Sequence, residues 1–384
     1  MRKGFWLIFL VLCLVLASVC GCASKQEGTV SPESQTEGEE ESVAAEKVTL
    51  RFANYFAGES GPGKIGQEFA DDIKELTDGR VEIEYYPGGM LLTADKMYDG
   101  VMQGIADIGL SNLSYTFGRF KVTEVMDLPI GFPNAWVSNH VASDFLKEFK
   151  PEEFKDTHVL TLHTSPPNNI ITVSKPVKKP EDLKGMILRA PGYIGQLVEA
   201  LGGTPRNVPM PEAYDNLAKG VLEGLLIPYE TTITFRYGEV TNHVTEVWPL
   251  GQVYTFYLVM NKDTWNKLSP DIQEIISNYI EEEFQEKLAQ MWNRIDIDGK
   301  QYAIDSGYTI TEIPAEEIDK WIGLSEKVLD KYIEKMVSNG YSQDEVQGWI
   351  SFIKERIAYW SAKQKELGIK SATGDKEVLY EFKQ

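Results

Sequence analysis

Apolar and polar positions alternate along residues 47–227 in a pattern that predicts two successive rounds of strands and helices. In the first round, strands are predicted at 47–53, 81–86 and 108–110, with helices at 65–76 and 94–103. In the second, strands are predicted at 159–163, 170–173, 186–190 and 224–227, with helices at 195–201 and 211–220. Strands and helices that alternate at these lengths form βαβ units with parallel pairing. The chain is therefore predicted to be α/β, with two similar lobes and a cleft between them.

The pattern becomes mostly helical from Ser269 onward. Apolar residues from Ile272 to Trp292 form one amphipathic stripe, which predicts a helix long enough to brace both lobes. Two further helices are predicted at 315–337 and 342–367. The acidic stretch Asp296-Ile-Asp298-Gly299 lacks the closing Glu of a calcium loop, so we interpret it as a turn that ends a helix.

The first residues have the features of a signal peptide. Arg2 and Lys3 precede an apolar run at 5–17, which is shorter than the about 20 residues of a membrane-spanning helix. The sequence Val19-Cys20-Gly21-Cys22 then resembles a lipobox, in which Cys22 would be diacylated and become the mature N-terminus. Residues 1–22 therefore predict export and a lipid anchor, with Cys20 as the weaker lipidation candidate and two chance cysteines as the alternative.

Composition limits the remaining possibilities. Residues 23–46 are rich in Ser, Thr and Glu and predict a disordered acidic tether. All three cysteines lie at the N-terminus, which excludes a disulfide framework in the body. The formal net charge of −20 argues against nucleic acid and against anionic lipid headgroups as partners. It does not exclude an anionic ligand, because a buried Arg dominates the potential at short range.

Sequence patterns of common catalytic and cofactor sites are missing. The four histidines have no metal-ligand spacing, and no nucleophile elbow or phosphate-binding loop occurs. The glycines at 58, 61 and 63 do not have the spacing of a dinucleotide-binding turn. We therefore predict no catalytic residues, no metal site and no cofactor.

Arg189 is the most informative single residue. It ends a predicted strand, and Pro191-Gly192 then leads into a helix. Ligands of open α/β sheets bind at the carboxyl ends of strands, and the guanidinium fork can hold a carboxylate through two parallel hydrogen bonds. From this feature alone, a solvated Arg on the surface is the competing interpretation.

A series of short motifs indicates a family. Examples are Tyr86-Pro-Gly-Gly-Met-Leu91, Gly104-x-Ala-Asp-Ile-Gly109 and Pro211-Glu-Ala-Tyr214. Others lie at 69–81, 115–120, 127–129, 176–185, 220–224 and 260–270. In this order and spacing they resemble DctP-type solute-binding subunits of TRAP (tripartite ATP-independent periplasmic) transporters, from residue 47 to about 367.

The resemblance implies a two-lobe, periplasmic-binding-protein-like fold with mixed sheets, a ligand cleft and a long bracing helix. Lobe I would span 47–165 and be completed by part of 251–300. Lobe II would span 166–250 and be completed by part of the C-terminal region, with helical bracing over 269–384.

The resemblance also assigns site residues. Arg189 would pair with the ligand carboxylate, and the position where many members have an Asn is Ile227 here, so the usual second anchor is missing. This leaves Tyr229 and Glu230 as polar groups at that strand end. Glu230 would either accept from a ligand hydroxyl or amine, or fix Arg189. His163 would be a ligand donor or a satisfied interior histidine, and the aromatic candidates for the pocket wall are Tyr55, Tyr115 and Tyr193.

The expected function is capture of a small organic carboxylate outside the cytoplasmic membrane and its delivery to a permease driven by a cation gradient. A monocarboxylate, such as a 2-oxo or aromatic acid, is favoured. The protein would be anchored by lipid in the periplasm or at the cell surface, close its lobes around the ligand, and not be an enzyme. The alternatives are a binding subunit of an ATP-driven importer, a ligand-sensing partner of a membrane receptor and, least favoured, a secreted hydrolase or lyase.

Overall fold

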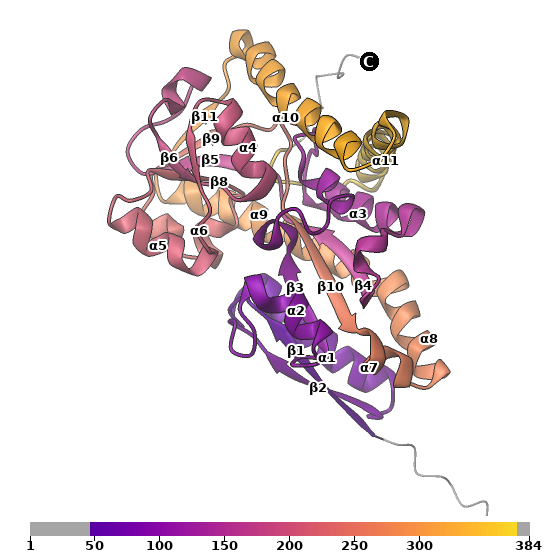
Figure 1. Ribbon diagram of the computed structural model, residues 1–384. Coiled ribbons are helices and arrows are strands. Elements are labelled where there is room, and N and C mark those ends of the chain that lie inside the picture. Colours follow the sequence, from indigo (N-terminus) through magenta and orange to yellow (C-terminus); the bar gives the residue numbers. More distant parts are fainter. Residues whose placement is uncertain (1–46, 375–384) are drawn as a thin grey trace, which may run out of the picture. The chain divides into compact units, whose positions relative to one another are not determined.

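The computed structural model describes residues 47–374, which lie in one compact unit beginning at Ala45 (Figure 1). The predicted signal peptide, Cys22 and the predicted tether lie outside the described residues. No helix within residues 47–374 is both long enough and apolar enough to cross a membrane.

The first lobe is built on a five-stranded mixed sheet. Its strands, in spatial order, are β2 (Val81–Tyr86), β1 (Val48–Asn54), β3 (Ile108–Asn112), β10 (Thr255–Asn261) and β4 (Thr157–Thr164). β1 pairs in parallel with β2 and β3, as the βαβ pattern predicts. β10 pairs antiparallel with β3 and β4, because the chain returns from the second lobe to fill this place.

The second lobe is built on a six-stranded mixed sheet. Its order is β11 (Thr309–Glu312), β9 (His243–Glu246), β5 (Asn169–Thr172), β8 (Gly224–Ile227), β6 (Ile187–Arg189) and β7 (Thr204–Arg206). β6 runs parallel to β7 and β8, whereas β5 is antiparallel to both of its neighbours. Residues 165–168 and 247–254 connect the two sheets.

Shorter helices flank the sheets. In the first lobe these are α1 (Gly61–Leu76), α2 (Met97–Met102), α3 (Ala135–Phe149) and α7 (Lys262–Lys267). In the second they are α4 (Gly192–Ala200), α5 (Met210–Ala218) and α6 (Thr231–Thr234). The N-terminus of α1 is capped by Ser60 Oγ, which accepts from Gly63 N at 3.2 Å. The predicted stripe of α1 is buried, including Phe69 and Ile73.

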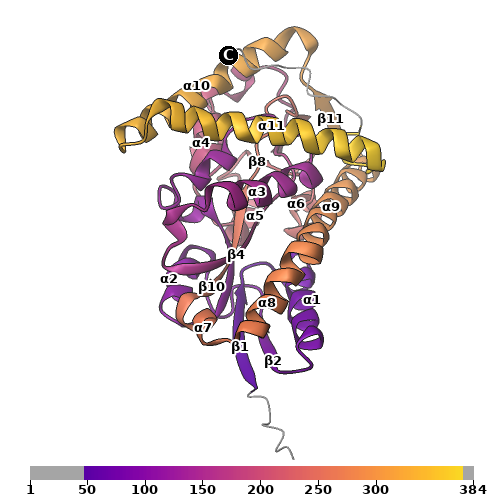
Figure 2. The same cartoon turned by 90° about the vertical axis from the view of Figure 1, so that its right-hand side faces the viewer.

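The predicted bracing helix is present. α8 (Pro270–Tyr279), a π-helical turn (Ile280–Phe284) and α9 (Gln285–Asp305) follow one another without a break. α9 packs against α1 and α3 of the first lobe and against α6 of the second (Figure 2). The last helices also serve both lobes, because α10 (Ile318–Ser338) packs on α4 and α11 (Gln343–Leu367) packs on α3.

One prediction in this region is wrong. Asp296 and Gly299 lie inside α9 rather than at a helix-ending turn. Both face the second lobe: Asp296 Oδ1 accepts from Glu230 N at 3.3 Å, and Gly299 lies against the backbone of Tyr229. Tertiary contacts therefore override the weak helix propensity of Asp and Gly at this point.

Candidate ligand-binding site

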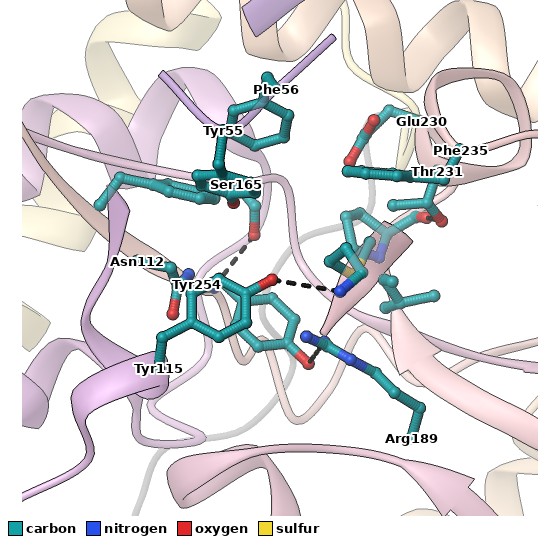
Figure 3. Close-up of a pocket in the computed structure, with 14 residues that line it drawn as sticks. Tyr55, Phe56, Asn112, Tyr115, Ser165, Arg189, Glu230, Thr231, Phe235 and Tyr254 are labelled. Atoms are coloured by element: carbon teal, nitrogen blue, oxygen red, sulfur yellow. Dashed lines mark hydrogen bonds between the residues drawn. The ribbon is translucent and has the colours of Figure 1, made fainter. Parts of the chain in front are cut away.

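A cavity between the lobes encloses about 320 Å³ of empty space, part of it open to solvent (Figure 3). Its walls come from both sheets. The lining residues are Tyr55, Phe56, Asn112, Tyr115, Ser165, Arg189, Met210, Ile227, Pro228, Glu230, Thr231, Phe235, Tyr254 and Phe256. Several of them lie at or just after the carboxyl ends of β1, β3, β6 and β8. This is the place where α/β sheets bind ligands.

The guanidinium of Arg189 is held in place by two hydrogen bonds. Its Nε donates to the carbonyl of Val208 at 3.0 Å, and its Nη1 donates to the hydroxyl of Tyr254 at 2.8 Å. That hydroxyl in turn donates to the carbonyl of Leu226 at 3.1 Å. These bonds use two of the five N–H donors of the side chain. The group is 2 % exposed, so it is a buried cation with donors left for a carboxylate.

The surroundings preserve the charge of Arg189. Burial lowers its pKa, but the phenol oxygens of Tyr254, Tyr115, Tyr237 and Tyr55 raise it, and the net result lies above the ordinary value. Burial also raises the pKa of Tyr55 well above its usual range, so that phenol stays neutral. The cavity therefore contains a permanent positive charge among uncharged hydroxyl groups.

Glu230 lies on a different side of the cavity from Arg189 (Figure 3). The pKa of its carboxyl is raised to about 8, mainly by burial and to a smaller extent by the nearby Asp296, although a hydrogen bond with Thr234 lowers it. Glu230 Oε2 has no hydrogen-bond partner among the described residues. The two hydrogen bonds of Arg189 go to other groups, so the structure does not support the interpretation that Glu230 fixes Arg189.

Aromatic rings form a large part of the remaining wall. The six rings are those of Tyr55, Phe56, Tyr115, Phe235, Tyr254 and Phe256. Tyr55 stacks on Phe56 with ring centroids 4.2 Å apart and meets Tyr115 edge-on at 5.6 Å. Flat apolar walls of this kind suit a ligand with a ring or another apolar portion.

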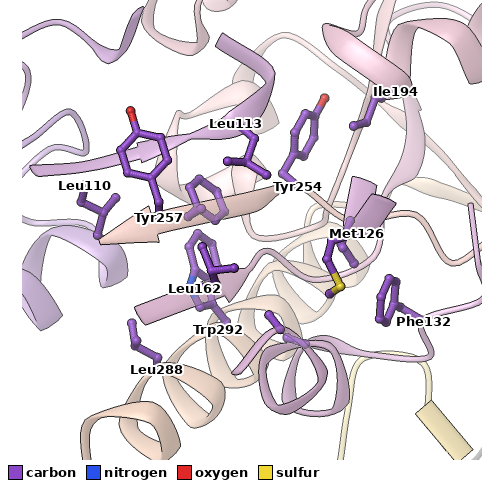
Figure 4. Close-up of a cluster of buried hydrophobic side chains, with 14 of the residues drawn as sticks. Leu110, Leu113, Met126, Phe132, Leu162, Ile194, Tyr254, Tyr257, Leu288 and Trp292 are labelled. Atoms are coloured by element: carbon purple, nitrogen blue, oxygen red, sulfur yellow. The ribbon is translucent and has the colours of Figure 1, made fainter. Parts of the chain in front are cut away.

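His163 lies one layer behind this wall. Its ring stacks on Phe256 at 5.0 Å, and its Nδ1 accepts a hydrogen bond from Trp292 Nε1 at 3.0 Å. Trp292 belongs to the apolar cluster that joins β4, β10 and α9 (Figure 4). Burial lowers the pKa of His163 to about 3, so the ring is neutral. The structure thus places His163 in the interior and not among the lining residues.

Tyr193 and Tyr229 also point away from the cavity. The ring of Tyr193 packs edge-on against Tyr332 at 5.5 Å, and its hydroxyl accepts from Lys335 Nζ at 3.4 Å. The hydroxyl of Tyr229 donates to Glu246 at 3.0 Å. Both residues therefore support the packing of the second lobe and its C-terminal helices. Of the other predicted residues, Arg189, Tyr55, Tyr115, Ile227 and Glu230 do line the cavity.

Sequence reasoning missed several lining residues. Phe56 and Asn112 had a usable signal, because each lies at or beside the end of a predicted strand. The second lobe has Ile227 where many family members have an Asn, but Asn112 supplies an amide to the cavity from the first lobe. The Oδ1 of Asn112 accepts from Ser114 N at 2.7 Å. Tyr254, Phe235 and Phe256 had no such signal, since they reach the cavity from segments far away in the sequence.

No group of three or more His, Cys, Asp or Glu side chains that could hold a metal ion occurs between residues 47 and 374. The one hydroxyl of a lining serine, Ser165 Oγ, donates to the carbonyl of Pro166 at 2.8 Å and accepts from Tyr254 N at 3.0 Å. The arrangement can therefore bind and enclose an anion.

Comparisons with known proteins agree with this geometry. The family model described as bacterial extracellular solute-binding protein, family 7 (DctP), matches residues 54–335. A TRAP solute-binding protein from Rhodoferax ferrireducens, solved with copurified benzoate, is 28% identical, with a TM-score of 0.76 over 84% of this chain and 100% of that one.

Two further proteins are similar to this chain. A TRAP periplasmic solute-binding protein from Desulfovibrio salexigens, solved as an open complex, is 27% identical, with a TM-score of 0.71 over 84% of this chain and 100% of that one. The C4-dicarboxylate-binding protein DctB of Bacillus subtilis is 24% identical over 304 residues, or 75% of this chain and 83% of that one.

Proposed function

We propose, since the chain belongs to the family-7 (DctP) bacterial extracellular solute-binding proteins, that it captures a small organic carboxylate outside the cytoplasmic membrane and delivers it to a TRAP permease. The observation that carries this proposal is the buried, charged guanidinium of Arg189 in a cavity between two lobes. A buried cation without a counter-ion is costly, and a ligand carboxylate supplies both the charge and the hydrogen bonds.

The charge of the cavity favours a ligand with one carboxylate. Arg189 is the only Lys, Arg or His among the residues that line the described cavity. The carboxyl of Glu230, with its pKa raised to about 8 by burial, is mostly neutral at pH 7. The cavity then has a net charge of +1, which one carboxylate neutralises, whereas a second carboxylate would be buried without a cation.

The apolar part of the ligand is proposed to be a ring. Six aromatic side chains leave a narrow space next to Arg189, and this shape supports an aromatic monocarboxylate over a 2-oxo acid with a short chain. The Rhodoferax relative, which was solved with benzoate, supports the same class.

Capture is proposed to proceed by closure of the lobes. The two connecting segments are paired by hydrogen bonds, from Ser165 N to the carbonyl of Tyr254 at 2.9 Å and from Asn168 N to the carbonyl of Gln252 at 2.8 Å. Tyr254 also contacts Arg189, so the ligand anchor is attached to the segment about which the lobes would turn. The Desulfovibrio relative in its open complex supports such a motion. Closure excludes water and strengthens the ion pair.

The chain is also proposed to be a lipid-anchored binder that does not convert its ligand. Export and diacylation at Cys22, with residues 23–46 as a tether, would keep the cleft close to its permease. Replacing Cys22 by Ser should move the protein from the membrane fraction to the soluble fraction in the native cell. Retention of the Cys22→Ser protein in the membrane fraction would contradict the anchor.

The carboxylate clamp can be tested by calorimetric titration of the purified full-length protein with benzoate. Arg189→Ala should weaken binding by about 100-fold or more, because charge-assisted hydrogen bonds contribute about 1.5–3 kcal/mol each. Arg206, on the adjacent strand and exposed, is the matched control, and Arg206→Ala should leave the affinity unchanged. Unchanged affinity in a folded Arg189→Ala variant would show that the clamp is wrong.

A further inference from the structure

The carboxyl group of Glu230 has a hydrogen-bonding capacity that the protein itself does not satisfy. The residue is 3 % exposed, and its Oε2 is buried without a partner among the described residues. Buried polar atoms in folded proteins are almost always hydrogen-bonded, because leaving water without a new partner costs free energy. Since Glu230 lines the ligand cavity, the missing partner can be a group of the ligand.

The position of Glu230 is fixed by its backbone. It follows β8, its N–H donates to Asp296 Oδ1 of α9 at 3.3 Å, and its carbonyl accepts from Thr234 N of α6 at 2.9 Å. Figure 3 shows its carboxyl group on a different side of the cavity from the guanidinium of Arg189. A rigid ligand whose carboxylate sits on Arg189 would therefore meet Glu230 with its other end.

The groups around Glu230 decide which ligand group fits. Asp296, from α9, acts on Glu230 as a like charge, and the phenols of Tyr55 and Tyr237 lie within electrostatic range of the carboxyl. Lys300, a cation of α9, bonds to Glu246 at 2.7 Å. A neutral carboxyl in these surroundings can both donate and accept, which matches a hydroxyl group. A second ligand carboxylate would find no cation there.

We propose that Glu230 is a specificity-determining residue that hydrogen-bonds a ring hydroxyl of the ligand, so that the preferred solute is a hydroxylated aromatic monocarboxylate. This inference rests on the proposed function, in which Arg189 holds the carboxylate of the same molecule. The hydroxyl is on the ring, away from the acid group, because Glu230 and Arg189 are on different sides of the cavity.

The test compares matched ligands on the purified full-length protein by calorimetric titration at pH 7. Benzoate, 3-hydroxybenzoate and 4-hydroxybenzoate differ by one hydroxyl and its position. At least one hydroxylated acid should bind tenfold or more tightly than benzoate, which corresponds to ~1.4 kcal/mol. If benzoate binds as tightly as both, the inference is wrong. Tighter binding of isophthalate, or of 3-(aminomethyl)benzoate, than of both hydroxybenzoates would also overturn it, in favour of a second carboxylate or an ammonium.

Two substitutions separate a direct contact from a structural role. Glu230→Gln keeps a donor and an acceptor and should keep the preference for the hydroxylated acid. Glu230→Leu removes both the donor and the acceptor, so the affinity for the hydroxylated acid should fall tenfold or more and the preference should disappear. The affinity for benzoate should stay as in the wild type or increase. If Glu230→Leu does not fold, it is replaced by Glu230→Met, whose side chain has nearly the length of Glu. The comparison of ligands on the wild-type protein still tests the inference in that case.

The outcomes distinguish this inference from the function on which it rests. Arg189-dependent binding of benzoate without a hydroxyl preference would refute the role of Glu230 alone. Binding of these acids that is unaffected by Arg189→Ala would refute the proposed clamp itself.

Discussion

Arg189 and Glu230 are both buried in the same cavity, but burial has opposite consequences for their charges. Arg189 keeps its charge because the ordinary pKa of a guanidinium is far above neutral pH and is raised further in this cavity. At Glu230, burial and the like-charged neighbour Asp296 raise the pKa of the carboxyl to about 8. The resulting positive cavity exists only while Glu230 holds its proton.

Ligand affinity should therefore depend on pH. Between pH 7 and pH 9 Glu230 loses its proton, and the new negative charge repels the bound carboxylate, so affinity for benzoate should fall by up to about tenfold. The phenol of Tyr254 does not contribute in this range, because burial raises its pKa far above 9. Calorimetric titration at the two pH values measures the effect. Glu230→Gln should be insensitive to this change, and an equal loss in that variant would assign the effect to another group.

Sequence reasoning at this scale placed Arg189 in the cavity but predicted only part of its surroundings. The strand end alone left a surface Arg as the competing interpretation, and the family resemblance decided for the cavity. The partner of Arg189, Tyr254, could not be predicted, because their contact joins positions 65 residues apart, through connections that only the folded chain defines. Tyr229 was misplaced for a local reason: it is the neighbour of Glu230, yet its side chain turns to Glu246 while that of Glu230 lines the cavity.

At the scale of elements, α9 connects the site to the rest of the second lobe. The Asp-x-Asp-Gly stretch at 296–299 has the composition of a turn, and the sequence predicted one. In the structure these residues are helical, and at Gly299 α9 lies too close to the loop after β8 to leave room for a Cβ. The strands and helices of the two lobes could be predicted from their periodicity. The antiparallel pairing of β5 and β10 could not, because it follows from how the chain crosses between the lobes.

Gly299 should be sensitive to the smallest substitution. A Cβ at this position would lie 2.5 Å from the carbonyl oxygen of Tyr229 and 2.7 Å from the nitrogen of Glu230. Gly299→Ala should therefore destabilise the protein by about 1–3 kcal/mol, as overpacking does, and should weaken ligand binding by displacing Glu230. Urea denaturation and calorimetric titration measure the two effects.

Gly323 of α10 provides the matched control, since a Cβ there would have no atom within 4 Å. Gly323→Ala should stabilise the protein by about 0.5–1 kcal/mol, because Ala is the better helix former. Equal effects of the two substitutions would contradict the close contact between α9 and the loop after β8.

At the scale of the whole molecule, buried carboxyl groups make stability depend on pH. Burial raises the pKa of Glu124, Asp127 and Asp296 to about 7, and that of Glu230 to about 8. The folded chain therefore retains protons on these groups that the unfolded chain, with carboxyl pKa values near 4, has already lost. Stability must fall with rising pH wherever the folded state binds more protons.

Two histidines, the half-buried His158 and the buried His163, act in the opposite direction, but in a lower pH range. Burial lowers the pKa of His158 to about 4 and that of His163 to about 3, so each destabilises the folded state only below its ordinary value of 6.5. Between pH 6.5 and pH 8 the carboxyl groups act without this opposition. Each fully protonated carboxyl contributes up to ~1.4 kcal/mol per pH unit.

The melting temperature of the ligand-free protein should thus fall by several degrees between pH 6.5 and pH 8. Thermal denaturation in buffers of equal ionic strength measures it, and Glu230→Gln should reduce the slope by removing one titrating group. A melting temperature that is constant or rises over this range would mean that the buried acids are ionised in the folded state. The cavity would then lose the net positive charge on which selection of a monocarboxylate depends, so this measurement on the empty protein also tests the proposed basis of its specificity.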